Sequence, residues 1–98
     1  MPDDGRARLE FIEIELRFVQ NCLRNGGLEL AHQNVTKAKE LLDAAKRSHD
    51  TALDQLPKVR REIDTRNLKA FARLLAEDIY ELQAEIEVLA ETKRYLRQ

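Results

Sequence analysis

Apolar residues recur at alternating spacings of three and four through most of the chain. This spacing places side chains on one face of an α-helix, and its persistence over many turns is typical of helices packed side by side. We call this row of residues the seam; it includes two polar residues, His49 and Lys93. Three segments carry it: Leu9, Ile12, Leu16, Val19 and Leu23; then Leu28, Ala31, Val35, Ala38, Leu42, Ala45, His49, Ala52 and Leu56; then Leu68, Ala72, Leu75, Ile79, Leu82, Ile86, Leu89, Lys93 and Leu96. The pattern therefore predicts an all-α fold.

Two pairs of residues interrupt this pattern. Gly26 and Gly27 follow the first segment, and glycine readily adopts the left-handed conformation that ends helices, so we expect a tight reversal there. Leu56-Pro57 closes the second segment; because proline lacks an N–H and restricts the preceding residue, we expect a turn, with a kinked continuous helix as the alternative. The predicted helices span about residues 4–24, 28–55 and 58–97 of a single helical domain, 1–98.

The third helix is the longest, and its start is open to two interpretations. It begins either at Pro57, a favoured first helical residue, or after a cap at Asp64 or Thr65. At about 1.5 Å per residue it spans roughly 50 to 60 Å, against about 42 Å for the second helix and 30 Å for the first. We therefore predict an antiparallel three-helix bundle, or a helical hairpin, with coiled-coil-like heptad seams and an overhanging C-terminal helix.

Charge and composition disfavour several classes of partner. The chain has 17 basic and 18 acidic residues and a net charge of −1, so no global field favours nucleic acid or an anionic membrane. Charges interrupt every apolar run long before the 18 or more residues that a membrane span needs. The N-terminus lacks a secretory pattern, and the single cysteine, Cys22, cannot form an internal disulfide. We expect a cytoplasmic protein.

A few residues could carry chemistry, and for each the structural interpretation is favoured. Glu29 and His32 have the Glu-x-x-His spacing of di-iron bundles, but the other two seams hold no acid, so we expect His32 to lie exposed near the start of the second helix. His49 lies on the seam, where we expect a partly buried side chain that donates a hydrogen bond. Histidine phosphotransfer or metal binding is the remote alternative. Cys22 is expected to act as a small apolar residue, and we predict no enzyme activity and no cofactor.

Charge is divided unequally along the third helix. Residues Lys58 to Arg73 include six basic and two acidic side chains, whereas Glu77 to Glu91 include six acidic and no basic ones. The acidic half is either a solvated face or a docking surface for a basic partner or a second copy of the chain.

The apolar arc of the first helix is too wide for one neighbouring helix. Together with the overhang and the divided charge, it predicts a non-enzymatic interaction or scaffold module that self-associates, a dimer with a two-fold axis near Leu75 being favoured. A small cytosolic chaperone or adaptor that binds a basic or helical protein partner is the alternative. The predicted interaction residues are Phe11, Ile14, Phe18, Leu75, Ile79, Leu82, Ile86, Leu89, Glu77, Asp78, Glu81 and Glu85.

Overall fold

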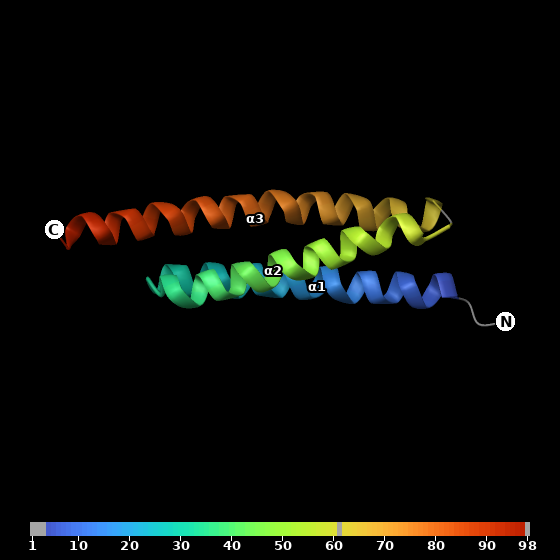
Figure 1. Ribbon diagram of the computed structural model, residues 1–98, viewed down its shortest axis with the longest axis horizontal. Helices are drawn as coiled ribbons and strands as arrows, with labels where there is room; N and C mark the ends of the chain where they lie inside the picture. Colours follow the sequence, from blue (N-terminus) through green and yellow to red (C-terminus); the bar gives the residue numbers. More distant parts are fainter. Residues whose placement is uncertain (1–3, 61, 98) are drawn as a thin grey trace.

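Three helices, antiparallel in sequence order, make up the computed structural model, which describes residues 4–60 and 62–97 (Figure 1). They are α1 (Asp4–Ala31), α2 (Val35–Gln55) and α3 (Glu62–Leu96), with one turn of 3-10 helix, η1 (Leu56–Lys58), between α2 and α3. The molecule is a rod with extents of 64 × 18 × 16 Å. The predicted all-α bundle with a long C-terminal helix is confirmed.

The first turn is not at the two glycines, and that prediction is wrong. α1 continues through both of them to Ala31, seven residues beyond the predicted end near residue 24. Gly26 is buried, and a Cβ atom built on it would lie only 2.9 Å from Cδ2 of Leu82 on α3. Glycine is present where the α1 backbone approaches another helix closely, rather than where the helix ends.

The residue that ends α1 is Gln33. Its φ of 62° is left-handed, its N–H donates to the carbonyl of Leu30 at 2.8 Å, and the Asn34 N–H donates to that of Glu29 at 2.8 Å. These two bonds satisfy carbonyls that a helix end otherwise leaves unpaired. Asn34 then caps α2, since its side chain accepts a bond from the Lys37 N–H at 3.2 Å. His32 therefore lies at the end of the first helix, and its predicted place near a helix start is wrong.

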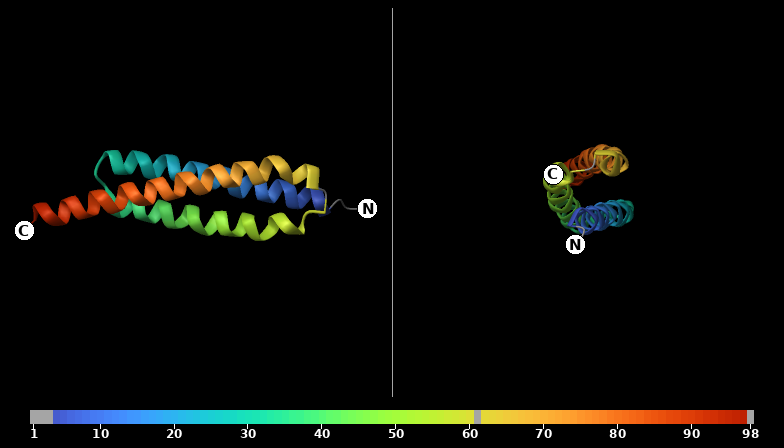
Figure 2. Two further views of the ribbon diagram at one scale, coloured as in Figure 1. Left: turned by 90° about the horizontal axis from the view of Figure 1, so that it is seen from above. Right: turned by 90° about the vertical axis from the view of Figure 1, so that its right-hand side faces the viewer.

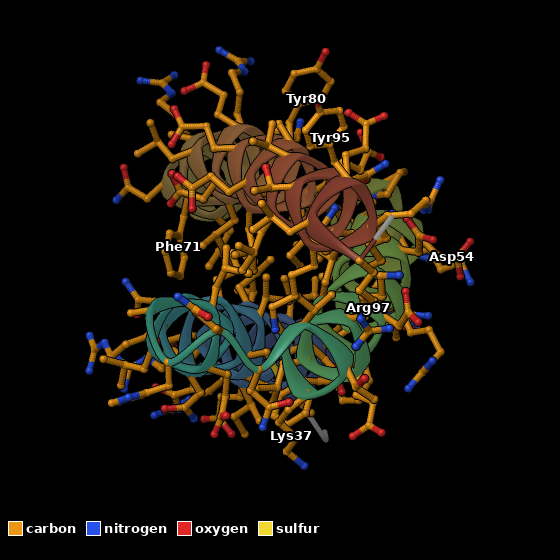
Figure 3. The ribbon with its side chains drawn as sticks, turned by 90° about the vertical axis from the view of Figure 1, so that its left-hand side faces the viewer. Lys37, Asp54, Phe71, Tyr80, Tyr95 and Arg97 are labelled. Atoms are coloured by element: carbon orange, nitrogen blue, oxygen red, sulfur yellow. The ribbon has the colours of Figure 1, made fainter. Side chains whose placement is uncertain are left out.

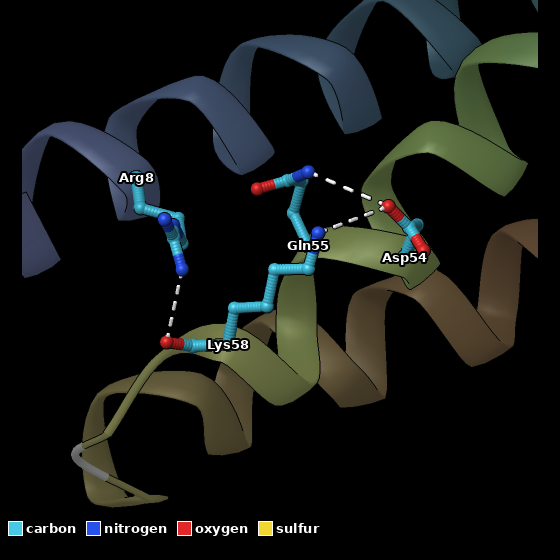
Figure 4. A network of polar contacts seen from close by, with 4 residues as sticks. All are labelled: Arg8, Asp54, Gln55 and Lys58. Atoms are coloured by element: carbon cyan, nitrogen blue, oxygen red, sulfur yellow. Dashed lines mark hydrogen bonds and ion pairs between the residues drawn. The ribbon is translucent and has the colours of Figure 1, made fainter.

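The second turn lies where proline predicted it. α2 ends at Gln55 and Pro57 lies within η1, so the turn is confirmed and the kinked helix is not formed. α3 begins at Glu62, which corrects both predicted starts: Pro57 precedes the helix, and residues 64 and 65 lie inside it. The Arg8 guanidinium donates to the Lys58 carbonyl at 3.1 Å and ties α1 to this turn (Figure 4).

The buried core contains most of the predicted seam. Ala38, Ala45 and Ala52 of α2 are buried, and these small side chains let α1 and α2 pack closely. The largest fully buried apolar side chains, Ile12, Leu16 and Val19, come from α1. The exposed members of the seam lie toward helix ends: Leu28 is 57% exposed, Leu96 is 76% exposed, and Ala31 is exposed as well.

α3 extends past the turn that joins α1 and α2, as its predicted length requires (Figure 2). Beside this turn, the Lys93 ammonium donates to the Gln33 carbonyl. Beyond Lys93, the described side chains from Arg94 to Arg97 are all exposed. The C-terminal end of α3 therefore has little cover from the rest of its own chain.

Candidate functional site

A groove runs between α1 and α3. Viewed end-on, α2 lies beside both of these helices, while α1 and α3 diverge on the side away from it (Figure 2). Two hollows open along this side, and both are lined by α1 and α3. We call this feature the α1–α3 groove. Its lining residues are Glu13, Arg17, Gln20, Asn21, Leu23, Arg24 and Gly27 from α1, and Asn67, Leu68, Phe71, Leu75, Asp78, Glu81, Leu82 and Glu85 from α3.

Side-chain size explains why the third side of the bundle is open. The α2 seam alternates alanine with larger residues, which brings α1 close, whereas α3 buries Leu75, Ile79, Leu82 and Ile86. Larger seam residues hold a helix axis farther from its neighbour. Leu82 lies close to α1 at Gly26, because this glycine has no side chain to oppose it. One hollow lies at this contact, and the other lies toward the N-terminal ends of α1 and α3.

The floor of the groove is apolar. Leu75 and Leu82 are buried, and Leu23, Leu68 and Phe71 are half-buried, with part of each side chain still exposed to solvent. The Phe71 ring points into the opening between α1 and α3 (Figure 3). A row of partly covered apolar side chains of this kind gains stability when another apolar surface displaces the water above it.

The two walls of the groove differ in charge. Glu13, Arg17 and Arg24 are exposed on the α1 wall, which has a net charge of +1, and Asp78, Glu81 and Glu85 are exposed on the α3 wall. Among the described side chains no ion pair joins the two walls, and the Arg17 guanidinium pairs instead with Glu13 on its own helix at 2.8 Å. The acidic wall is therefore available to a basic ligand.

The structure places the predicted interaction residues in different environments. Leu75, Ile79, Leu82 and Ile86 are at most 9% exposed, because α1 and α2 of the same chain cover them. These four residues belong to the core of their own chain, and the two-fold axis near Leu75 stays a prediction.

The acidic residues and the α1 residues have other positions. The predicted acids Asp78, Glu81 and Glu85 line the groove, whereas Glu77 is exposed and does not line it. Leu89 is half-buried near the end of α3. Phe11, Ile14 and Phe18 are 43%, 66% and 48% exposed on α1, outside the groove.

Sequence reasoning missed the basic wall and the aromatic residue of the groove. Arg17 and Arg24 were not among the predicted interaction residues, because the open side of α1 depends on where α3 lies. Phe71 directly precedes the seam alanine Ala72, and a large residue beside a small seam residue is the one signal that could have identified it. Leu68 was assigned to the seam but not to a binding surface.

The histidines and the cysteine have structural positions. His49 is 7% exposed, and its Nε2 donates to the Ala72 carbonyl at 2.8 Å, which confirms the predicted buried hydrogen bond and joins α2 to α3. Cys22 is 4% exposed, and burial raises the pKa of its thiol, which disfavours the reactive thiolate. His32 is exposed. Within residues 4–60 and 62–97, no three His, Cys, Asp or Glu side chains gather as metal ligands would.

None of the described helices combines the length and the apolar character that crossing a membrane requires. Comparison of the chain with protein-family models, with curated proteins and with solved structures finds no match.

Proposed function

We propose that this chain is a non-enzymatic interaction module that binds an amphipathic helix in the α1–α3 groove. The observation that carries the proposal is the open third side of the bundle, with an apolar floor between a basic and an acidic wall. In a four-helix bundle the corresponding side is filled by a further helix. Helix-in-groove recognition uses this combination of an apolar stripe and flanking polar residues.

The geometry of the groove defines the partner that fits it. Asn67 and Glu85 lie at its two ends on α3, a separation of about 27 Å at 1.5 Å per residue, which is close to five helical turns. A partner helix would present an apolar stripe to the floor and basic side chains to Asp78, Glu81 and Glu85. Because reversing the helix direction exchanges its two flanks, the unlike walls favour one direction of binding.

An adaptor function is the second candidate, and one observation favours it. Phe11, Ile14 and Phe18 form a second exposed apolar stripe on α1, outside the groove. A protein that joins two partners requires two such surfaces. In either function the cytoplasm is the proposed location, since a reducing compartment suits the single buried thiol of Cys22.

Photo-cross-linking from the groove tests the proposal. A benzophenone side chain placed at Gln20 or at Arg24, both of which line the groove, should form covalent adducts with a polypeptide in cells that express the protein. The matched control places the same group at Arg47, which is exposed on α2. Mass spectrometry identifies each adduct. The proposal is contradicted if neither groove position gives an adduct, or if Arg47 gives the same adducts.

A further inference from the structure

Resting on the proposed function, we propose that the helix bound in the α1–α3 groove is the C-terminal end of α3 from a second copy of this chain. The α3 end of each copy would bind in the α1–α3 groove of the other copy, with a two-fold axis near Leu89. In this closed dimer the uncovered α3 end of each copy lies at the end of the groove between Glu81 and Glu85 of the other copy.

The first argument is the uncovered end itself. Leu96 is 76% exposed and Leu89 is only half-buried, although both belong to the apolar seam of α3. The hydrogen bond from Lys93 to Gln33 lies beside the α1–α2 turn, and the helix continues past it into solvent (Figure 2). Exposed leucine side chains at a helix end gain stability when a second surface covers them.

The second argument is that the groove floor and the uncovered end lie on one face of one helix. Leu75 and Leu82 line the groove and lie seven residues apart, and Leu89 and Leu96 continue the same row at intervals of seven. A helix drifts by only about 20° over seven residues, so these positions stay aligned. A two-fold axis perpendicular to α3 at Leu89 exchanges the two halves of this face.

The third argument is register and charge. With two antiparallel α3 helices centred on Leu89, Leu96 of one copy lies at the level of Leu82 of the other. Lys93 then lies at the level of Glu85, and Arg97 at that of Glu81. The described end from Glu91 to Arg97 carries three basic residues and one acidic residue, whereas the α3 wall of the groove carries three acids. Opposite charge on the two segments guides their approach.

The α1–α2 turn limits where the axis can lie. Gln33 and Asn34 of this turn line a hollow together with Ala90 and Lys93 of α3, so α1 ends at about the level of Leu89. An axis closer to Leu75 would make the α1–α2 hairpins of the two copies overlap along their length. An axis near Leu89 leaves each α1 on its own side of the dimer.

Molar mass by light scattering at micromolar concentration is the first test. The wild-type chain should have twice its mass of 11.4 kDa. Leu96→Glu should raise the dimer dissociation constant by at least about tenfold, because it places a charge in an apolar contact. Tyr95→Glu is the matched control: Tyr95 is 77% exposed and points away from α1 and α2 (Figure 3), and its substitution should leave the dissociation constant unchanged.

Disulfide cross-linking tests the position of the axis. In a Cys22→Ala background, Leu89→Cys should form a disulfide-linked dimer under mild oxidation, because a residue near the axis lies close to its own copy. Tyr95→Cys in the same background should not. The inference is overturned if the wild-type chain is a dimer but the Leu89→Cys variant does not cross-link. It is also overturned if Leu96→Glu and Tyr95→Glu raise the dimer dissociation constant equally.

The outcomes distinguish this inference from the proposed function. A wild-type chain that stays monomeric overturns the inference, while photo-adducts with a different polypeptide from Gln20 or Arg24 would leave the proposed function standing. A monomer that gives no groove adducts contradicts both. Groove adducts between two copies of the chain support both.

Discussion

Gly26 of α1 faces Leu82 of α3 so closely that a Cβ atom on the glycine would lie 2.9 Å from Leu82 Cδ2. Gly27, the next residue, has no such neighbour within 4 Å. The two glycines therefore differ in what a methyl group would meet, although both lie within α1 and have ordinary helical φ values.

Gly27→Ala should stabilise the protein by about 0.5–1 kcal/mol, because alanine favours the helix and nothing obstructs the new methyl group. Gly26→Ala should be less stable than Gly27→Ala by at least about 1 kcal/mol, since the same gain is opposed by overpacking against Leu82. Urea unfolding of the two variants measures the difference. Equal stabilisation by both would show that Leu82 moves aside without cost.

Gln33 adopts the left-handed conformation that glycine adopts more easily. Gln33→Gly should raise the free energy of unfolding by about 0.5–1 kcal/mol, and Gln33→Val should lower it, because a branched side chain fits this conformation poorly. Lys93 donates to the backbone carbonyl of Gln33, so this bond can persist in both variants. Thermal unfolding gives the order of stability, and a valine variant as stable as the glycine variant would contradict the assignment of the helix end.

His49 and His32 should respond differently to replacement by alanine. His49→Ala removes the 2.8 Å bond to the Ala72 carbonyl and leaves a cavity between α2 and α3, and we expect a loss of about 1–3 kcal/mol. His32→Ala changes an exposed side chain and should stay within about 0.5 kcal/mol of the wild type. Denaturant unfolding compares the two. Equal losses would contradict a structural role specific to His49.

Ala45 has no exposed surface, and a larger side chain there should separate α1 from α2. Ala45→Leu should therefore destabilise the protein by about 1–3 kcal/mol. Ala84→Leu makes the same change at an exposed position of α3 and should have little effect. An unchanged melting temperature for Ala45→Leu would place this alanine outside a close helix contact.

The features predicted correctly from the sequence depend on local signals. Spacings of three and four identify the seam whatever covers it, and Pro57 marks a turn because its ring and missing N–H act on the chain nearby. The end of α1 was missed by seven residues because the role of Gly26 depends on Leu82, which is distant in sequence. Gln33 has no strong preference for a left-handed conformation, so nothing local marks it as the end of a helix.

The groove is harder to predict for a related reason. The seam shows that Leu75 and Leu82 are buried, but not whether their own chain or a second one covers them. The observed cover comes from α1 and α2 of the same chain, which moves the accessible surface to the flank of the seam. Arg24 and Phe71 belong to that flank because α1 and α3 diverge there, a property of the packing of all three helices.

The observed end of α1 lies seven residues, or one heptad, beyond the predicted end. Because the seam repeats every seven residues, nearly the same residues belong to it whether α1 ends at the predicted or at the observed residue. A hairpin of α1 and α2 shortened or lengthened by whole heptads would keep its buried residues in phase. Such a change would alter only how far α3 extends beyond the hairpin. The reach of this protein toward a neighbour can thus vary in steps of about 10 Å without a new core.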